Sequence, residues 1–171
     1  MIKRELYMNR IRPFIGGELI KVMTGIRRSG KSVMLELIKE ELAEAGVAPS
    51  QMISINFEDM RYSHLQTATA LHDEIIKRAE GIEGKAYLFF DEIQEVEGWE
   101  KCVNSLRVAL DCDIYITGSN AKLLSGELAT YIGGRYVEFV IYPFSFAEFL
   151  ELYHTCLLYT SDAADDLTRV D

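Results

Sequence analysis

A short stretch at residues 25–32, GIRRSGKS, combines two glycines, a lysine and a hydroxyl in the pattern G-x-x-x-x-G-K-[ST]. Glycines at this spacing let the backbone curl around an anion with its N–H groups pointing inward. A helix that begins near Lys31 would direct the positive end of its dipole toward the same anion. In this pattern Lys31 reaches the β- and γ-phosphates of a nucleotide and Ser32 binds Mg²⁺. The residues that we expect to contact the phosphates are Gly25, Ile26, Arg27, Arg28, Ser29, Gly30, Lys31, Ser32 and Val33.

The surroundings of this phosphate loop support the assignment. The apolar run LIKVMT (19–24) predicts a buried strand that ends at the loop. The run SVMLELIKEELAEAG (32–46) predicts a helix that begins in the loop and ends near Gly46. Arg27 and Arg28 lie inside the loop, and the sequence leaves open whether they contact phosphate or are solvated surface charges.

A pair of acidic residues, Asp91 and Glu92, ends the apolar run KAYLFFDE (85–92). Phosphoryl transfer to water needs a metal ion held in place and a water molecule held in line with the phosphate. Asp91 suits the magnesium role, and Glu92 suits the role of general base. The chain has no NKxD motif for recognition of guanine. A glutamate directly after the magnesium aspartate favours hydrolysis by water over transfer to a small-molecule substrate.

Two polar positions follow the run DIYIT, within a strand predicted at 113–120. Ser119 or Asn120 is suited to sense the γ-phosphate or to hold the attacking water, and the choice between them is open. Asn120 is equally placed to cap a helix that follows it.

Arg135 precedes a further predicted strand, at 135–142. An arginine at this position could reach a γ-phosphate across a subunit interface and stabilise the charge of the transition state. This role requires a homo-oligomer. The alternative is an ordinary surface ion pair.

The elements that must position these residues alternate between strand-like and helix-like runs. Strands are predicted at 19–24, 51–59, 85–92, 113–120 and 135–142, and one of the intervening helices at 64–80. Such alternation predicts a parallel sheet covered by helices on both faces, an α/β sandwich of three layers. Ligands of these sheets bind beyond the carboxyl ends of the strands. Because the phosphate loop, the acidic pair and the polar positions all follow strand ends, we expect one shared site.

Composition and charge limit the function classes. The chain has 171 residues, of which 49% are hydrophobic and 26% charged, as expected for one globular domain. No apolar run approaches the ~20 residues of a membrane span, so we expect a cytoplasmic protein without a membrane partner. The net charge of −9 argues against a large nucleic-acid interface. The cysteines show no metal-binding spacing, and we expect neither a zinc site nor a disulfide framework.

The last residues depart from the rest of the chain. The stretch CLLYTSDAADD matches a translation of the transposon adapter used in sequencing-library preparation. We therefore expect residues 156–171 to be adapter-derived, and residues 1–155 to be an ATP-binding domain at the front of a longer protein.

Longer stretches carry a resemblance to a known family. The stretches TGIRRSGKS, FFDEIQEVEGWEKCVNSLR, DIYITGSNAKLLS and GGRYVEFVIYPFSFAEFL resemble those of prokaryotic AAA-type P-loop ATPases, in family order and over most of residues 1–155. The resemblance implies a five-stranded sheet of order 5-1-4-3-2, with ATP and Mg²⁺ as cofactors. It also implies the acidic pair at Asp91 and Glu92, a polar sensor at Ser119 or Asn120, and further C-terminal domains that are missing here.

Three hypotheses of function follow. The first is an Mg²⁺-dependent ATPase that releases ADP and phosphate. The second is a slow ATP-gated switch, and the third is an ATPase that acts on DNA; both would work through the missing C-terminal region. We expect the chain by itself to bind nucleotide weakly and to turn it over slowly, because the adenine side of the site would be open to water.

Overall fold

The computed structural model describes residues 2–119, 123, 132–150 and 152–153. Within these residues the strands are β1 (Ile20–Thr24), β2 (Met52–Asn56), β3 (Ala86–Asp91), β4 (Cys112–Gly118) and β5 (Tyr136–Val140). The α-helices of the same part are α1 (Glu5–Ile11), α2 (Lys31–Glu44), α3 (Ala68–Ala79) and α4 (Trp99–Ala109). Short 3₁₀ turns occupy η1 (Arg12–Phe14), η2 (Pro49–Gln51), η3 (Met60–Leu65) and η4 (Ile93–Glu95). None of the helices in the described ranges is long and apolar enough to cross a membrane.

The strands form one sheet with the order β2-β3-β4-β1-β5, and every neighbouring pair is parallel. Read from the other edge, this is the predicted order 5-1-4-3-2. Because all strands run in one direction, their carboxyl ends lie along one edge. The loop after β1 is therefore next to the carboxyl end of β4, and the carboxyl end of β3 lies on the other side of β4.

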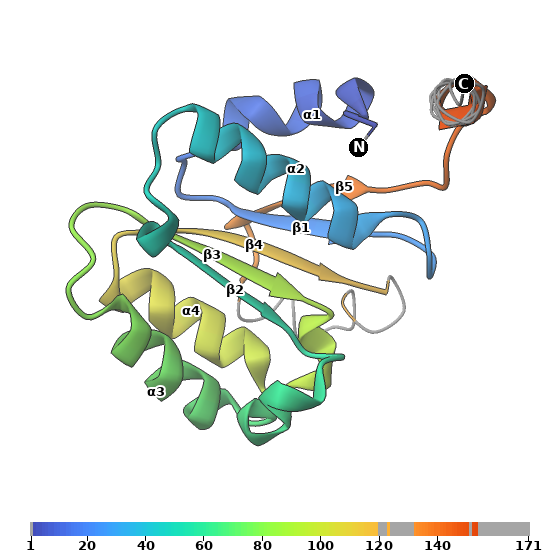
Figure 1. Cartoon of the computed structure of the whole chain (residues 1–171). Helices are drawn as coiled ribbons and strands as arrows, with labels where there is room; N and C mark the ends of the chain where they lie inside the picture. Colours follow the sequence, from blue (N-terminus) through green and yellow to red (C-terminus); the bar gives the residue numbers. More distant parts are fainter. Residues whose placement is uncertain (1, 120–122, 124–131, 151, 154–171) are drawn as a thin grey trace, which may run out of the picture.

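Helices cover both faces of this sheet, as predicted (Figure 1). On the face of α1 and α2, the rings of Phe89 and Tyr115 stack with their centroids 4.8 Å apart. On the face of α3 and α4, the core includes Leu88, Phe90 and Ile116. Alternate residues of β3 and β4 thus enter different cores, which explains why these strands are apolar at nearly every position.

The ends of the helices follow from local sequence. Helix α2 stops where Gly46 takes a left-handed conformation with φ 93°, and Val47 N–H donates to Leu42 O at 3.0 Å. This is a glycine-terminated helix end in which the last carbonyls are satisfied. Helix α3 begins at Ala68, four residues later than predicted, because Thr67 caps it through a hydrogen bond from Ala70 N–H. The residues before it form the turn η3.

The predicted capping box after β5 is also present. Ser145 Oγ accepts from Glu148 N–H at 3.2 Å, and Glu148 Oε2 accepts from Ser145 N–H at 2.7 Å. Residues 146–150 are helical.

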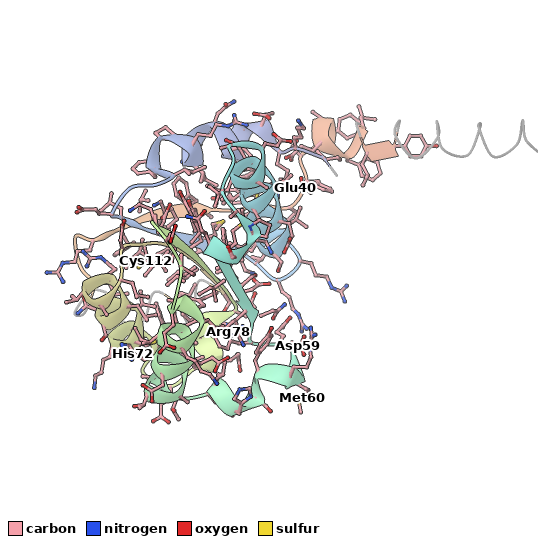
Figure 2. All side chains as sticks on the ribbon, turned by 60° about the vertical axis from the view of Figure 1, so that its left-hand side comes forward. Glu40, Asp59, Met60, His72, Arg78 and Cys112 are labelled. Atoms are coloured by element: carbon pink, nitrogen blue, oxygen red, sulfur yellow. The ribbon has the colours of Figure 1, made fainter. Side chains whose placement is uncertain are left out.

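A buried ion pair ties the amino edge of the sheet to the chain before β1. Lys21 of β1 and Asp113 of β4 are both fully buried and form a short ion pair. Asp113 also accepts from Gly16 N–H at 2.6 Å and from Tyr115 Oη–H at 2.7 Å. Burial lowers the pKa of Lys21, although Asp113 opposes that shift. Figure 2 labels Cys112 at this amino edge and Asp59 beyond the carboxyl end of β2.

We predict that Asp113→Ala lowers the free energy of unfolding by about 3–5 kcal/mol, because it leaves the Lys21 ammonium buried without its partner. The matched control is Asp111→Ala, which removes a pair with Lys85 whose aspartate side chain is 68% exposed, and which should cost no more than about 1 kcal/mol. Urea unfolding measures both variants. Equal shifts in the two variants would contradict the prediction.

Candidate functional site

A pocket of about 410 Å³ opens at the carboxyl edge of the sheet, where the sequence predicts the shared site. Its lining comes from the phosphate loop, from the start of α2, from the end of β3 and from the segment after β2. The lining residues are Arg27, Arg28, Gly30, Lys31, Ser32, Val33, Glu58 and Glu92.

The phosphate loop depends on its two glycines. Gly25 has φ 152°, and a Cβ atom at this position would clash with the carbonyl oxygen of Ile141. Gly30 has φ 93° and caps the amino end of α2. The first N–H groups of a helix have no partner within the helix, so those of α2 are available to an anion at the loop. Ser29 Oγ is buried and has no hydrogen-bond partner among the described residues.

Lys31 lies at the first position of α2 and folds back over the loop. Its side chain is only 5% exposed, and its Nζ donates to Gly25 O at 3.4 Å. The same Nζ lies 3.2 Å from Glu92 Oε1. The loop and the end of β3 therefore meet through an ion pair between the buried Lys31 and the partly buried Glu92.

The acidic pair is held by the neighbouring strand β4. Thr117 Oγ–H donates a short hydrogen bond to Asp91 Oδ1, and Thr117 Oγ1 accepts from Glu92 N–H at 3.0 Å. Asp91 is buried. A single hydroxyl thus sets the position of both residues.

Glu92 has an unusual backbone conformation, φ 55° and ψ 47°. This left-handed region is unfavourable for a residue with a Cβ atom, and such strain gathers at functional sites. The turn brings the Glu92 carboxylate back toward the loop. Lys31 contacts one of its oxygens, and Gln94 Nε2 donates to the other at 2.5 Å.

The two predicted sensor positions are only partly described. Ser119 follows β4 directly and is half-buried, and its carbonyl oxygen accepts from Leu123 N–H at 3.0 Å. Asn120 lies outside the described residues. The choice between the two positions therefore stays open.

Arg135 lies away from the site of its own chain. Its carbonyl oxygen accepts from Ile20 N–H at 3.0 Å, at the amino end of β1. Its exposed side chain donates to Asn104 Oδ1 of α4 at 3.2 Å. Because the phosphate loop follows the opposite end of β1, only a second subunit could bring Arg135 to a phosphate.

The two loop arginines are exposed and line the pocket, so both of their predicted roles stay open. Arg28 has a positive φ of 65°. The pocket also contains Glu58, which the sequence analysis does not select. The sequence analysis does not select Gln94 or Thr117 either. Each lies within two residues of a predicted site residue or a predicted strand end, which is the one signal that could have identified them.

A buried arginine, Arg4, joins the phosphate loop to the segment after β5 through hydrogen bonds. Arg4 Nη1 donates to Ser29 O at 2.8 Å and Nη2 to Tyr142 O at 2.7 Å. Its Nε donates to Glu148 Oε1 at 2.9 Å. Burial alone would raise the pKa of Glu148, but hydrogen bonds from Arg4 and Ser145 outweigh it and the net shift is downward.

A second pocket, of about 200 Å³, lies beside the first and shares part of its lining. The two pockets have Arg28, Gly30 and Val33 in common, and the second adds Arg4, Ser29 and Phe144. The guanidinium of Arg4 lies 5.1 Å from the centre of the Phe144 ring.

These features fit a nucleotide with a magnesium ion. The glycine cradle, the free helix terminus and Lys31 are suited to phosphate groups. The hydroxyl of Ser32 and the carboxylate of Asp91 are oxygen ligands of the kind that Mg²⁺ prefers.

Comparisons with known proteins show the family and the fold of the chain. The family described as "AAA domain" matches residues 18–150. A protein of Haemophilus influenzae without an assigned function is 48% identical over 150 residues, which cover 88% of this chain and 38% of that protein. A similar protein of Methanocaldococcus jannaschii is 41% identical over 133 residues, 77% of this chain and 28% of that protein. The chain thus spans well under half the length of these relatives.

Among solved structures, AMPPCP-bound DnaA from Aquifex aeolicus shares the fold. The TM-score is 0.51 at 17% sequence identity, and the match covers 82% of this chain and 46% of that chain. The family match extends over most of the chain, from before β1 to residue 150, within the helical residues after β5. The chain therefore belongs to the family of prokaryotic AAA-type P-loop ATPases.

Proposed function

We propose that the chain binds ATP with Mg²⁺ and hydrolyses it to ADP and phosphate. The observation that carries this proposal is the contact between Lys31 Nζ and Glu92 Oε1, 3.2 Å apart in the pocket at the phosphate loop. A cation suited to the phosphates and a carboxylate suited to activate water thus share one site.

In this proposal the two pockets divide the nucleotide between them. The first pocket, with the loop N–H groups and Lys31, takes the phosphates. The second, with Phe144 and the aliphatic side chain of Val33, takes the adenine ring. Arg4 links the two, because it bonds to the loop carbonyl of Ser29 and also lines the second pocket.

The chemistry then follows from the positions of the side chains. Ser32 and Asp91 would hold Mg²⁺, which supplies charge neutralisation at the β- and γ-phosphates. Glu92 orients a water molecule and accepts its proton as the oxygen attacks the γ-phosphorus and the bond to the β-phosphate oxygen breaks. Phosphate oxygens compete with Glu92 for Lys31, so nucleotide binding releases the carboxylate for this role.

We predict that Lys31→Ala weakens ATP binding by about 10- to 100-fold, which corresponds to the loss of one charge-assisted hydrogen bond. Lys39→Ala is the matched control, because Lys39 lies on the same helix and pairs with Glu36. Isothermal titration of ATP with Mg²⁺ measures both variants. Equal affinity of the Lys31 variant and the unchanged chain would refute a phosphate role for Lys31.

We predict that Glu92→Gln retains ATP binding and slows hydrolysis by about 10²- to 10⁴-fold, the usual contribution of a general base. Single-turnover experiments with protein in excess over labelled ATP measure this rate even where turnover is slow. The control is Glu97→Gln, which changes an exposed carboxylate of the same segment. If the unchanged chain hydrolyses ATP no faster than the Glu92 variant, the slow ATP-gated switch replaces the ATPase.

We also propose that Arg135 acts across a subunit interface in a homo-oligomer. Arg135→Ala should leave ATP affinity unchanged and lower turnover, by up to about 10³-fold. Asn104→Ala removes the contact of Arg135 within its own chain and should leave turnover unchanged. Turnover per subunit should rise with protein concentration in the unchanged chain and in Asn104→Ala, but not in Arg135→Ala. A rate independent of concentration and unaffected by Arg135→Ala would exclude this role.

An action on DNA remains a separate hypothesis, and no contact among the described residues favours it.

A further inference from the structure

Gln94 lies two residues after Glu92, in the turn η4, and contacts the carboxylate directly. Its Nε2 donates to Glu92 Oε2 at 2.5 Å, while Lys31 Nζ lies 3.2 Å from Glu92 Oε1. The two oxygens of Glu92 therefore have separate donors, one from the phosphate loop and one from the turn after β3.

The orientation of the Gln94 amide is determined by this contact. An ionised carboxylate only accepts hydrogen bonds, so the NH₂ group must face Glu92 and the carbonyl must face away. The carbonyl oxygen Oε1 is then directed at Gly118, the last residue of β4, where an added Cβ atom would clash with it. Only a glycine at Gly118 leaves room for the amide in this orientation.

The same carbonyl oxygen is buried and has no hydrogen-bond partner among the described residues. A buried acceptor without a partner lowers the stability of the fold. A glutamine that served the fold alone would satisfy both ends of its amide. A carbonyl without a partner among the described residues indicates that the amide is placed for its contact with Glu92, at a cost in stability.

We propose that Gln94 is a positioning residue for hydrolysis, which holds Glu92 toward the attacking water. When the phosphates bind Lys31, Glu92 loses one of its two donors. The hydrogen bond from Gln94 then keeps the carboxylate oriented in the pocket. This inference rests on the proposed ATPase function and adds to it a residue that acts through Glu92 without contacting the nucleotide.

The test uses Gln94→Met, which keeps the length of the side chain and removes both the donor and the unpaired carbonyl. Single-turnover hydrolysis should slow by about 10- to 100-fold, because small displacements of a catalytic group cost rates of this size. Affinity for a non-hydrolysable ATP analogue should stay within about twofold. The midpoint of urea unfolding should be unchanged or higher. If Gln94 were needed only for folding, its substitution would instead lower the midpoint of urea unfolding.

Two comparisons separate the possible failures. In the Glu92→Gln background, Gln94→Met should cause no further loss of rate, since Gln94 acts through Glu92. Gln66→Met, at an exposed glutamine, is the control for the substitution itself. If Glu92→Gln slows hydrolysis and Gln94→Met does not, the positioning role is refuted and the ATPase stands. If Glu92→Gln leaves the rate unchanged, the proposed function itself fails.

Discussion

The parallel pairing of β3, β4 and β1 is the constraint on which the site depends. These strands run in register, so Asp91, Gly118 and Thr24 all lie at one edge of the sheet. The residues that follow them are far apart in sequence but adjacent in space. Helices on both faces keep the strands buried, which leaves this edge as the place where polar groups can meet a ligand.

At this edge, stability and function compete. Glu92 has a left-handed backbone conformation. Among the described residues, the buried Gln94 Oε1 and Ser29 Oγ have no hydrogen-bond partner. Each of these features has a cost in free energy. They all lie within a few residues of the Lys31–Glu92 contact. The buried pair of Lys21 and Asp113 at the opposite edge instead has further hydrogen-bond partners, because Gly17 O accepts from Lys21 and Asp113 accepts from Gly16 N–H and Tyr115 Oη–H. Among the described residues, these costs thus lie at the carboxyl edge of the sheet, around the candidate site.

The phosphate loop also receives support from the segment before α1 and from the segment after β5. Arg4, before α1, bonds to the loop and to the segment after β5. Gly25 packs so closely against Ile141 that no other residue fits there. The geometry of the loop therefore depends on the segment that follows β5. Any change in the position of that segment would be transmitted to the phosphate site through these two contacts.

Much of this could be predicted from the sequence, because its signals are local. Apolar runs and glycine spacing identified the strands, the loop, the helix end at Gly46 and the acidic pair, and the family resemblance supplied the strand order. The contacts of Gln94, Thr117 and Arg4 could not be predicted, because they join residues through the fold and carry no motif. The sequence by itself determined which groups are available for phosphate chemistry. Only the tertiary structure decided that Lys31 meets Glu92 and that Arg135 lies at the opposite edge, because strand register and the turn at Glu92 set those distances.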